Sequence, residues 1–281
     1  MAGERRAAVE ARLHRVVAAH RVTIAVVFPV VGAVLLVASA EGWLPAPLAF
    51  NPLLVLAGAA VMRLPVVAGL APLVDRRGAL ALLAIATYAY AVEFVGLATG
   101  LPYGEFSYQA PLGPMLFGAL PAGLALFFLP LVVDGYLLAV RLLGRRAATA
   151  WVRVPVAVGC VIAIDLVLDP AAVALGLWSY AAGGFYGVPL SNFAGWLLSA
   201  TVAVGLFEAG FHHGDVARRA EQHPYLLDDL VSFVLLWGLV TAFYGAWLAT
   251  AVALAFGLAL ATLGHFDRLA WLGPDRGEPA Q

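Results

Sequence analysis

The chain has 281 residues, of which 63% are hydrophobic and 12% are charged, and its formal net charge is −1. Soluble domains are nearer half apolar and a quarter charged, so this composition excludes an ordinary soluble enzyme and a disordered chain. All 16 basic residues are arginine, and the absence of lysine excludes a retinal Schiff base, a pyridoxal phosphate site and a Walker A loop. The balanced charge does not indicate a nucleic-acid partner. A single cysteine, Cys160, excludes an internal disulfide and a multi-cysteine metal centre.

Apolar runs of about 20 residues, the length needed to cross a bilayer, recur along the chain. They predict an all-α fold, a polytopic transmembrane helical bundle with about eight spans. The spans are expected at roughly 22–40, 52–74, 78–98, 115–140, 151–169, 192–211, 228–244 and 246–264. The last two share one apolar run divided near Gly245, so seven spans is the alternative. We expect one membrane-embedded domain over 1–272 and a disordered tail over 273–281.

The arginines predict how the spans are oriented. With the N-terminus in the cytoplasm, fifteen of the 16 arginines fall in cytoplasmic segments, and the four outer segments contain none. This distribution satisfies the positive-inside rule and predicts a multi-pass protein of the cell membrane with both termini cytoplasmic. The remaining arginine, Arg63, lies inside a span and is expected to pair with an acid.

Two of the outer segments, 99–114 and 170–191, are rich in glycine, proline and aromatic residues. One interpretation is a set of turns with an aromatic belt at the membrane interface. The other is a pair of ordered aromatic loops that fold over one site, because irregular backbone at membrane depth must pack on protein or line a cavity. We favour the pair of ordered loops.

Acidic residues lie inside the spans beside these loops. Asp165 and Asp169 are four residues apart and therefore share one helix face, and Pro170 is expected to end the helix after Asp169. Glu93 lies near the outer end of the third span, and Glu105 lies in the first loop. Burying an acidic side chain in a membrane costs free energy, and acids found there are usually functional. The alternative is that these residues only form hydrogen bonds with neighbouring helices. The candidate catalytic residues are Asp165, Asp169, Glu93 and Glu105.

These residue types suit one kind of chemistry. A carboxylic acid in an apolar pocket keeps its proton at neutral pH and can donate it, and aromatic faces stabilise a developing cation. Together they suit protonation of an alkene in an apolar substrate. An Asp-x-x-x-Asp spacing also occurs in membrane prenyltransferases, but those enzymes use basic residues for the diphosphate, and these loops contain no arginine. The histidines show no metal-ligand spacing, and protonation of an alkene followed by capture of the cation needs water as its only co-substrate, so we expect no metal and no other cofactor.

Two segments resemble the CruF-type carotenoid hydratases. The first, EFVGLATGLPYGEFSYQAPLGPMLF over 93–117, is similar to the family pattern E-x-x-G-x-x-T-G-x-P-Y-G-x-[FY]-x-Y followed by L-G-P. The second, over 165–196, is similar to D-x-x-x-D-P followed by G-x-W and then G-V-P-x-x-N-F-x-G-W. The matches run in order over about a hundred residues, which makes them far more specific than a short motif.

The resemblance implies hydration of a terminal isopropylidene double bond of a carotenoid to a tertiary alcohol. Bacterial members act on the linear end of a C40 carotene, and archaeal members hydrate both ends of bisanhydrobacterioruberin to give the C50 pigment bacterioruberin. The stretch FNPLLVLAGAAVMRLP and the all-arginine basic set favour the haloarchaeal branch. The implied partners are the carotenoid, water, the lipid bilayer and other enzymes of carotenoid biosynthesis.

We assign roles to the candidate residues from their chemistry. Asp165 or Asp169 would be the general acid, and the other would stabilise the cation or deprotonate water. Asn192 would position the water. The aromatic residues expected to line the pocket are Tyr103, Tyr108, Trp178, Tyr186 and Trp196. Two alternatives are a lyase or cyclase of the same lipid class and a non-enzymatic carotenoid-binding or transport protein.

Overall fold

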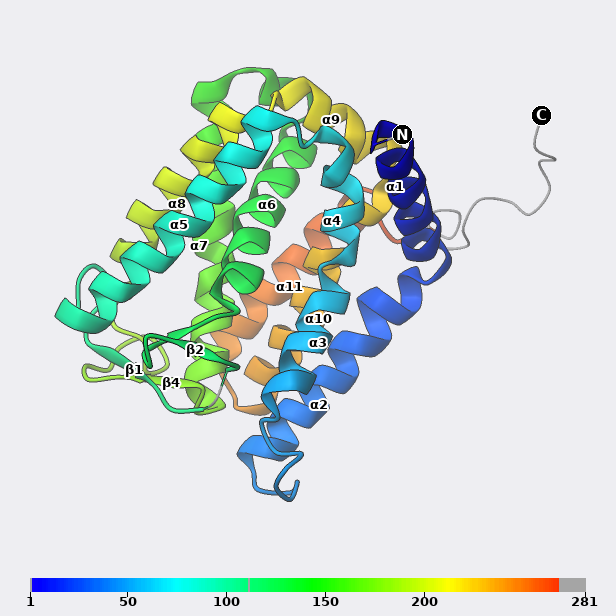
Figure 1. Ribbon diagram of the computed structural model, residues 1–281. Coiled ribbons are helices and arrows are strands. Elements are labelled where there is room, and N and C mark those ends of the chain that lie inside the picture. Colours follow the sequence, from blue (N-terminus) through cyan, green and yellow to red (C-terminus); the bar gives the residue numbers. More distant parts are fainter. Residues whose placement is uncertain (1, 111, 268–281) are drawn as a thin grey trace.

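The computed structural model describes residues 2–110 and 112–267 and is predominantly helical (Figure 1). Its helices are α1 (Ala2–Ala19), α2 (Phe28–Ala40), α3 (Pro52–Met62), α4 (Leu64–Leu70), α5 (Arg76–Thr99), α6 (Leu124–Leu143), α7 (Ala150–Ala174), α8 (Leu190–Gly210), α9 (His213–Gln222), α10 (Asp228–Phe243) and α11 (Trp247–Thr262). Its strands are β1 (Phe106–Tyr108), β2 (Met115–Leu116), β3 (Leu120–Pro121) and β4 (Trp178–Tyr180). The prediction of an all-α bundle is confirmed.

Several helical segments are long and apolar enough to cross a membrane. Within the described residues there are six of them: Thr23–Ala40, Arg76–Thr99, Leu124–Ala148, Ala150–Ala174, Leu190–Gly210 and Pro224–Phe243. The bent pair Pro52–Met62 and Leu64–Leu73 raises the number to seven if it forms one span, and α11 is a shorter apolar helix of 16 residues. The chain is therefore a polytopic helical membrane protein.

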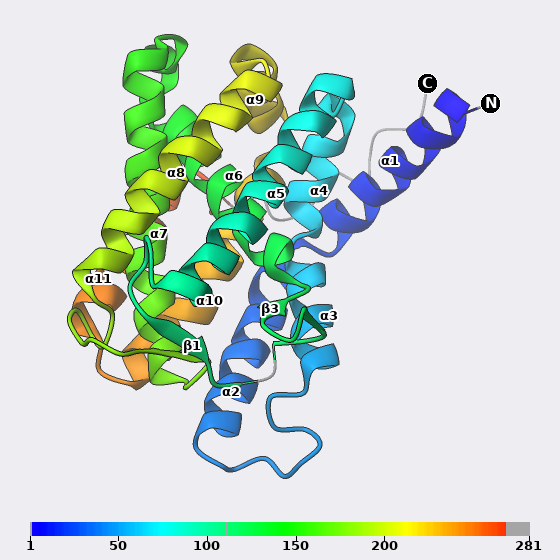
Figure 2. The same cartoon turned by 60° about the vertical axis from the view of Figure 1, so that its left-hand side comes forward.

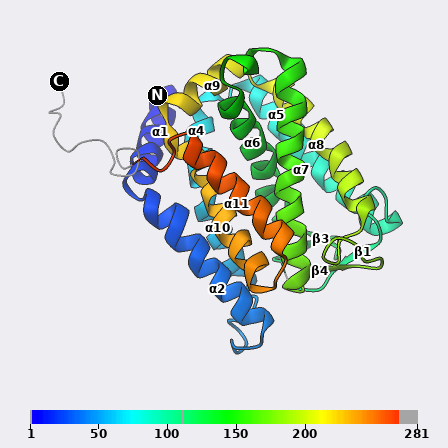
Figure 3. The same cartoon turned by 180° about the vertical axis from the view of Figure 1, so that it is seen from behind.

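The helices pack in two groups that meet along α7 and α10. Helices α6 and α7 lie side by side, as do α5 and α8, and α8 also contacts α7 (Figures 1 and 3). Helix α10 packs on α2, α11 and α7, while α1 lies at the edge of the bundle against α4 (Figure 2). Strands β1, β2 and β4 lie at one end of the bundle, with β3 paired to β2, and α9 lies at the other end (Figure 1).

The fourth span is shorter than the sequence predicts. We expected it over 115–140, but α6 begins at Leu124, and the residues before it form the hairpin of β2 and β3. Phe117 and Gly118 have positive φ at the turn, and Pro121 lies in the second strand. Helical backbone is disfavoured at such positions, so the prediction of helix over 115–123 is wrong.

The fifth span is longer than the sequence predicts. Helix α7 does not end at Asp169 but continues through Pro170 to Ala174. Proline removes one intrahelical hydrogen bond, but Asp169, Pro170 and Ala171 are all buried, so packing on neighbouring helices holds the last turn. Asp169 therefore lies inside the helix, more than one turn before its end.

The second span is broken at Arg63, where α3 ends and α4 begins with a bend of 42°. Pro65 in the first turn of α4 cannot donate a hydrogen bond to α3, which accounts for the break. The prediction of a single domain over 1–272 stays a prediction, and the expected tail over 273–281 lies outside the described residues.

Candidate active site

The two aromatic loops are joined by backbone hydrogen bonds. Strand β1 pairs with β4 in antiparallel register, with Phe106 opposite Tyr180 and Tyr108 opposite Trp178. Because side chains alternate along a strand, these four aromatic residues share one face of the strand pair. All four line a cavity between the strands and the helices. The structure therefore joins the two expected loops over one cavity, and the functional role of that cavity stays a prediction.

A cluster of two carboxyl groups and one amide lies beside these strands. Asp165 and Asp169 on α7 face Asn192 in the first turn of α8, and all three are almost fully buried. The Asn192 amide donates one proton to Asp165 Oδ2 at 3.2 Å and the other to Asp169 Oδ2 at 2.5 Å. One side chain therefore holds both carboxyl groups in place.

Tyr180 completes the cluster from β4. Its hydroxyl lies 2.9 Å from Asp169 Oδ2 and 3.0 Å from Asn192 Oδ1, and it donates its single proton to one of them at a time. Burial and the charges of Asp169 and Asp165 raise the pKa of Tyr180 far above its usual range. Tyr180 therefore remains a neutral donor throughout the physiological pH range.

Glu93 on α5 forms a second acidic position in the same cavity. Tyr108 on β1 donates a short hydrogen bond to Glu93 Oε1. Burial and the neighbouring Glu93 raise the pKa of Tyr108 well above its usual range, so Tyr108 is also a neutral donor. Tyr103 lines the cavity as well, with its hydroxyl 2.7 Å from Ser199 Oγ.

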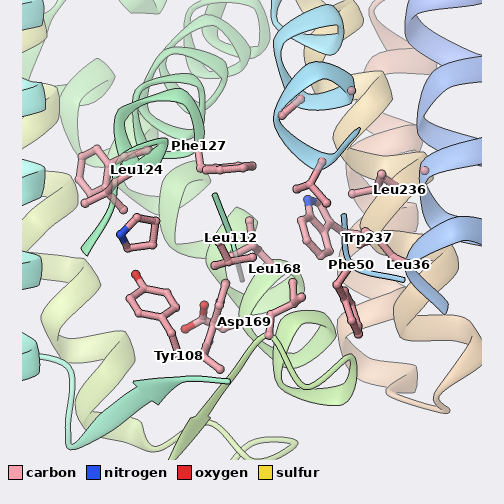
Figure 4. A pocket seen from close by; sticks show the side chains of 18 of the residues that line it. Leu36, Phe50, Tyr108, Leu112, Leu124, Phe127, Leu168, Asp169, Leu236 and Trp237 are labelled. Atoms are coloured by element: carbon pink, nitrogen blue, oxygen red, sulfur yellow. The ribbon is translucent and has the colours of Figure 1, made fainter. Parts of the chain in front are cut away.

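The cavity is mostly apolar. Its volume is about 280 Å³, and further empty space lies where it opens to the surface. Figure 4 shows Tyr108 and Asp169 on one side and Trp237, Leu36 and Phe50 on the other. This shape and lining suit a long apolar ligand with one end at the carboxyl cluster.

The structure brings together most of the predicted site residues. Those that line the cavity are Asp169, Glu93, Tyr103, Tyr108, Trp178, Asn192 and Trp196. Asp165 is fully buried behind Asn192 and does not line the cavity. Glu105 is exposed, and Tyr186 is 38% exposed with its hydroxyl accepting a hydrogen bond from the backbone of Leu248. Both lie outside the cavity lining.

Three aromatic residues that line the cavity were not among the candidate site residues. Tyr180 belongs to the cluster, Phe106 lies opposite it, and Phe128 on α6 stacks on Trp196 with ring centroids 5.3 Å apart. The alternation of Phe106 with Tyr108 and of Trp178 with Tyr180 was the available signal, because it places each pair on one face of a strand.

A second polar cluster lies toward the opposite end of the bundle. Arg63 pairs with Asp229 at 2.5 Å, as the sequence predicts for an arginine inside a span. Arg21 binds Asp228 through two hydrogen bonds of 2.7 Å, and His265 lies 2.9 Å from the same carboxylate. Over 2–110 and 112–267, no group of three or more His, Cys, Asp or Glu side chains is arranged to hold a metal ion.

These features define a class of protein, a helical membrane protein with an apolar cavity that has buried acids at one end. The chain belongs to the family of carotenoid biosynthesis proteins, whose model matches residues 50–260. It is 56% identical over 257 residues to a bisanhydrobacterioruberin hydratase of Haloarcula japonica, covering 92% of this chain and 88% of the relative. The family expected from the two motifs is confirmed. No solved structure matches the chain.

Proposed function

We propose that the chain is a carotenoid hydratase that adds water to the terminal isopropylidene double bonds of bisanhydrobacterioruberin, the carotenoid in the name of its relative. The observation that carries the proposal is the position of Asp169. Its carboxyl group reaches an apolar cavity while Asn192 and Tyr180 fix its orientation. A fixed acid in a water-poor pocket is what protonation of an alkene requires.

In the first step Asp169 donates its proton to the less substituted carbon of the double bond. The π electrons form the new C–H bond, and the electrons of the broken O–H bond remain on the carboxylate. The positive charge develops on the carbon that bears two methyl groups, where alkyl groups stabilise it best. The faces of Tyr108 and Trp178 stabilise this cation because aromatic faces carry negative potential.

In the second step a water molecule attacks the cation and loses a proton. Glu93 is the proposed base, because it lines the same cavity and is oriented by Tyr108. The new C–O bond uses a lone pair of the water, and a solvent proton relay from Glu93 to Asp169 restores the acid. The sum is one alkene plus one water giving one tertiary alcohol, with no oxidant or reductant. Asp165 acts only through Asn192 and is a positioning residue.

We further propose that the protein crosses the cell membrane eight times with both termini in the cytoplasm. The contacts of Asp228 support an even number of spans, since Arg21 precedes α2 and His265 follows α11 and both touch this carboxylate. This shared partner supports placing the two chain segments on the same side of the membrane. The arginine distribution supports the cytoplasmic side, and α11 would then be the eighth span.

The test is expression in a host that accumulates the anhydro carotenoid, followed by mass analysis of the pigments. Wild type should give hydrated pigment, and Asp169→Asn should lower the rate by about 10²–10⁴-fold because the amide cannot transfer the proton. Asp215→Asn on α9, which lies outside the cavity lining, is the matched control. Hydration by Asp169→Asn at the wild-type rate would contradict the assignment. Pigment bound by wild type without hydration would favour a carrier, and hydration of C40 carotenes alone would favour the C40 hydratase.

A further inference from the structure

One arm of the cavity runs between α2 and α3, away from the carboxyl cluster. On α2 the lining positions extend from Phe28 to Ser39. Beside them, lining positions extend from Asn51, the N-cap residue of α3, to Met62, at spacings that keep them on one helix face. Each of these stripes covers eleven residue steps, or about 17 Å at the helical rise. The arm is therefore a groove that follows the helices for about half of a bilayer.

The groove is open along its side. Phe28, Leu35 and Leu54 line it and are nevertheless 39%, 42% and 53% exposed. They belong to apolar segments of membrane-spanning character, so the opening faces hydrocarbon rather than water. An apolar chain can cross such an opening without losing an apolar environment.

Small residues make room in the middle of the groove. Gly58 on α3 lies opposite the α2 stripe, and a Cβ atom added there would meet no heavy atom within 4 Å among the described residues. Gly32 on α2 is tighter, because its added Cβ would lie 2.8 Å from Leu236 Cδ1. The free space beside Gly58 is therefore available to a ligand.

The far end of the groove is closed by a buried ion pair. Arg63 lines the cavity, is only 8% exposed and pairs with Asp229 at 2.5 Å. An apolar chain gains nothing by displacing a buried ion pair, because both charges would be left unpaired. A ligand that follows the groove must therefore leave it sideways before it reaches Arg63.

We propose that this groove binds the polyene segment next to the reacting end and that the rest of the substrate leaves between α2 and α3 into the bilayer. Three backbone bonds of an extended chain span about 3.5 Å, so the groove of about 17 Å holds about 15 backbone bonds. The chain of a C50 carotenoid is longer than this, so part of the molecule has to lie outside. This inference rests on the proposed function, because it takes the carotenoid as the occupant.

A substrate with two reactive ends cannot be hydrated at both ends in one binding event. Only one end can lie at Asp169 while the other end of the molecule lies in lipid. The enzyme must release the singly hydrated carotenoid and bind it again from the opposite end. The singly hydrated species therefore passes free through the membrane before the doubly hydrated product appears.

The test compares Gly58→Leu with Gly205→Leu in a host that makes the C50 carotenoid. Gly205 is a helical, exposed glycine on α8 whose added Cβ also meets nothing within 4 Å, and it lies outside the cavity lining, so it is a matched control. Each variant is purified in detergent, and both the carotenoid that copurifies and the hydrated pigment in the cells are measured. Gly58→Ala is the smaller step if Gly58→Leu does not accumulate.

Gly58→Leu should lose at least about tenfold in both bound carotenoid and product, with a smaller loss in Gly58→Ala, whereas Gly205→Leu should keep both. Asp169→Asn separates the two proposals, because it should keep the bound carotenoid while losing the product. If wild type bound carotenoid but made no hydrated product, the hydratase proposal would be overturned, whereas the proposal that the groove binds the polyene would stand. Equal carotenoid binding by Gly58→Leu, Gly58→Ala and Gly205→Leu would overturn the proposal that this groove binds the polyene.

Discussion

Tyr180 on β4 donates a hydrogen bond to Asp169 on α7 across 2.9 Å. The two residues are only eleven positions apart, but the chain leaves the helix and turns back into a strand between them. The pair of strands β1 and β4, which covers one end of the cavity, therefore contributes directly to the orientation of Asp169. Changes in either loop should act on the proton-donating group and not only on access to it.

We predict that Tyr180→Phe slows hydration by about 10–100-fold while the protein still accumulates. Asp169 becomes a carboxylate as it donates its proton, and hydrogen bonds to charged groups contribute about 1.5–3 kcal/mol, so loss of the hydroxyl should raise the barrier by about this amount while the ring is retained. Initial rates of pigment hydration by purified protein in lipid vesicles provide the measurement. Tyr244→Phe, which loses a hydroxyl bonded to Glu41 outside the cavity, should react at the wild-type rate. A wild-type rate in Tyr180→Phe would show that the hydrogen bond from Tyr180 does not orient Asp169.

Acidification should destabilise the protein through His223, between α9 and α10. Burial, Arg219 and His14 lower the pKa of His223 to about 4. The unfolded chain therefore binds more protons than the folded protein between about pH 6.5 and 4, so the free energy of unfolding falls as the pH is lowered through this range. Thermal unfolding in detergent at pH 7 and pH 5 should show the loss.

His223→Gln is the variant that checks this assignment. Glutamine keeps an acceptor for the hydrogen bond from Arg219 Nη1, which lies 2.6 Å from His223 Nε2, but it does not titrate. The difference in midpoint between pH 7 and pH 5 should shrink in this variant. His212→Gln, whose side chain is 76% exposed, should retain the full difference. An unchanged difference in His223→Gln would assign the acid sensitivity to other groups.

The ion pair of Arg63 with Asp229 provides a prediction about stability. Arg63→Ala leaves Asp229 as a buried charge without its counter-ion, which typically costs about 3–5 kcal/mol. For a chain of this size the apparent unfolding midpoint should fall by about 10 °C. The double variant Arg63→Met with Asp229→Leu removes both charges and should recover most of the loss. Equal midpoints for the single and double variants would show that the pairing is not the stabilising feature.

The sequence was informative where a property depends on nearby residues. Apolar runs located the spans, and the spacing of four placed Asp165 and Asp169 on one face of α7. Glycine, proline and aromatic content indicated that the two loops are ordered, because such backbone has to be supported at membrane depth. The candidate residues from the sequence therefore already included Asp165, Asp169 and Asn192.

What the sequence could not show depends on pairing between distant segments. The register of β1 with β4 brings Tyr180 into the cluster, and no local pattern sets that register. The stability of α7 beyond Pro170 comes from burial rather than from helix propensity. Glu105 and Tyr186 were reasonable candidates by residue type, but the strand and turn geometry place them outside the cavity.

Reporter fusions provide a test of the proposed topology. Fusions after Arg77, Arg146 and Arg219 should report the cytoplasm, and fusions after Gly104 and Gly183 should report the outside. A fusion at the C-terminus should also report the cytoplasm if α11 is an eighth span. A C-terminus on the outside, with the other five positions as predicted, would leave seven spans.

The last prediction concerns the source of the oxygen and follows from the tertiary cation. Water captures the cation at the carbon that bears two methyl groups, so each hydrated end should gain the mass of one water and carry only a tertiary alcohol. In heavy-oxygen water the new hydroxyl should carry the label, because no other oxygen donor takes part in the two steps. The reaction should also proceed at the same rate without molecular oxygen and without a reductant. Mass spectrometry of pigment formed by purified protein in lipid vesicles measures both outcomes, and Asp169→Asn provides the unlabelled background. An alcohol whose oxygen comes from molecular oxygen would mean a hydroxylation, which neither Asp169 nor Glu93 can perform, and the acid-catalysed route would then be wrong.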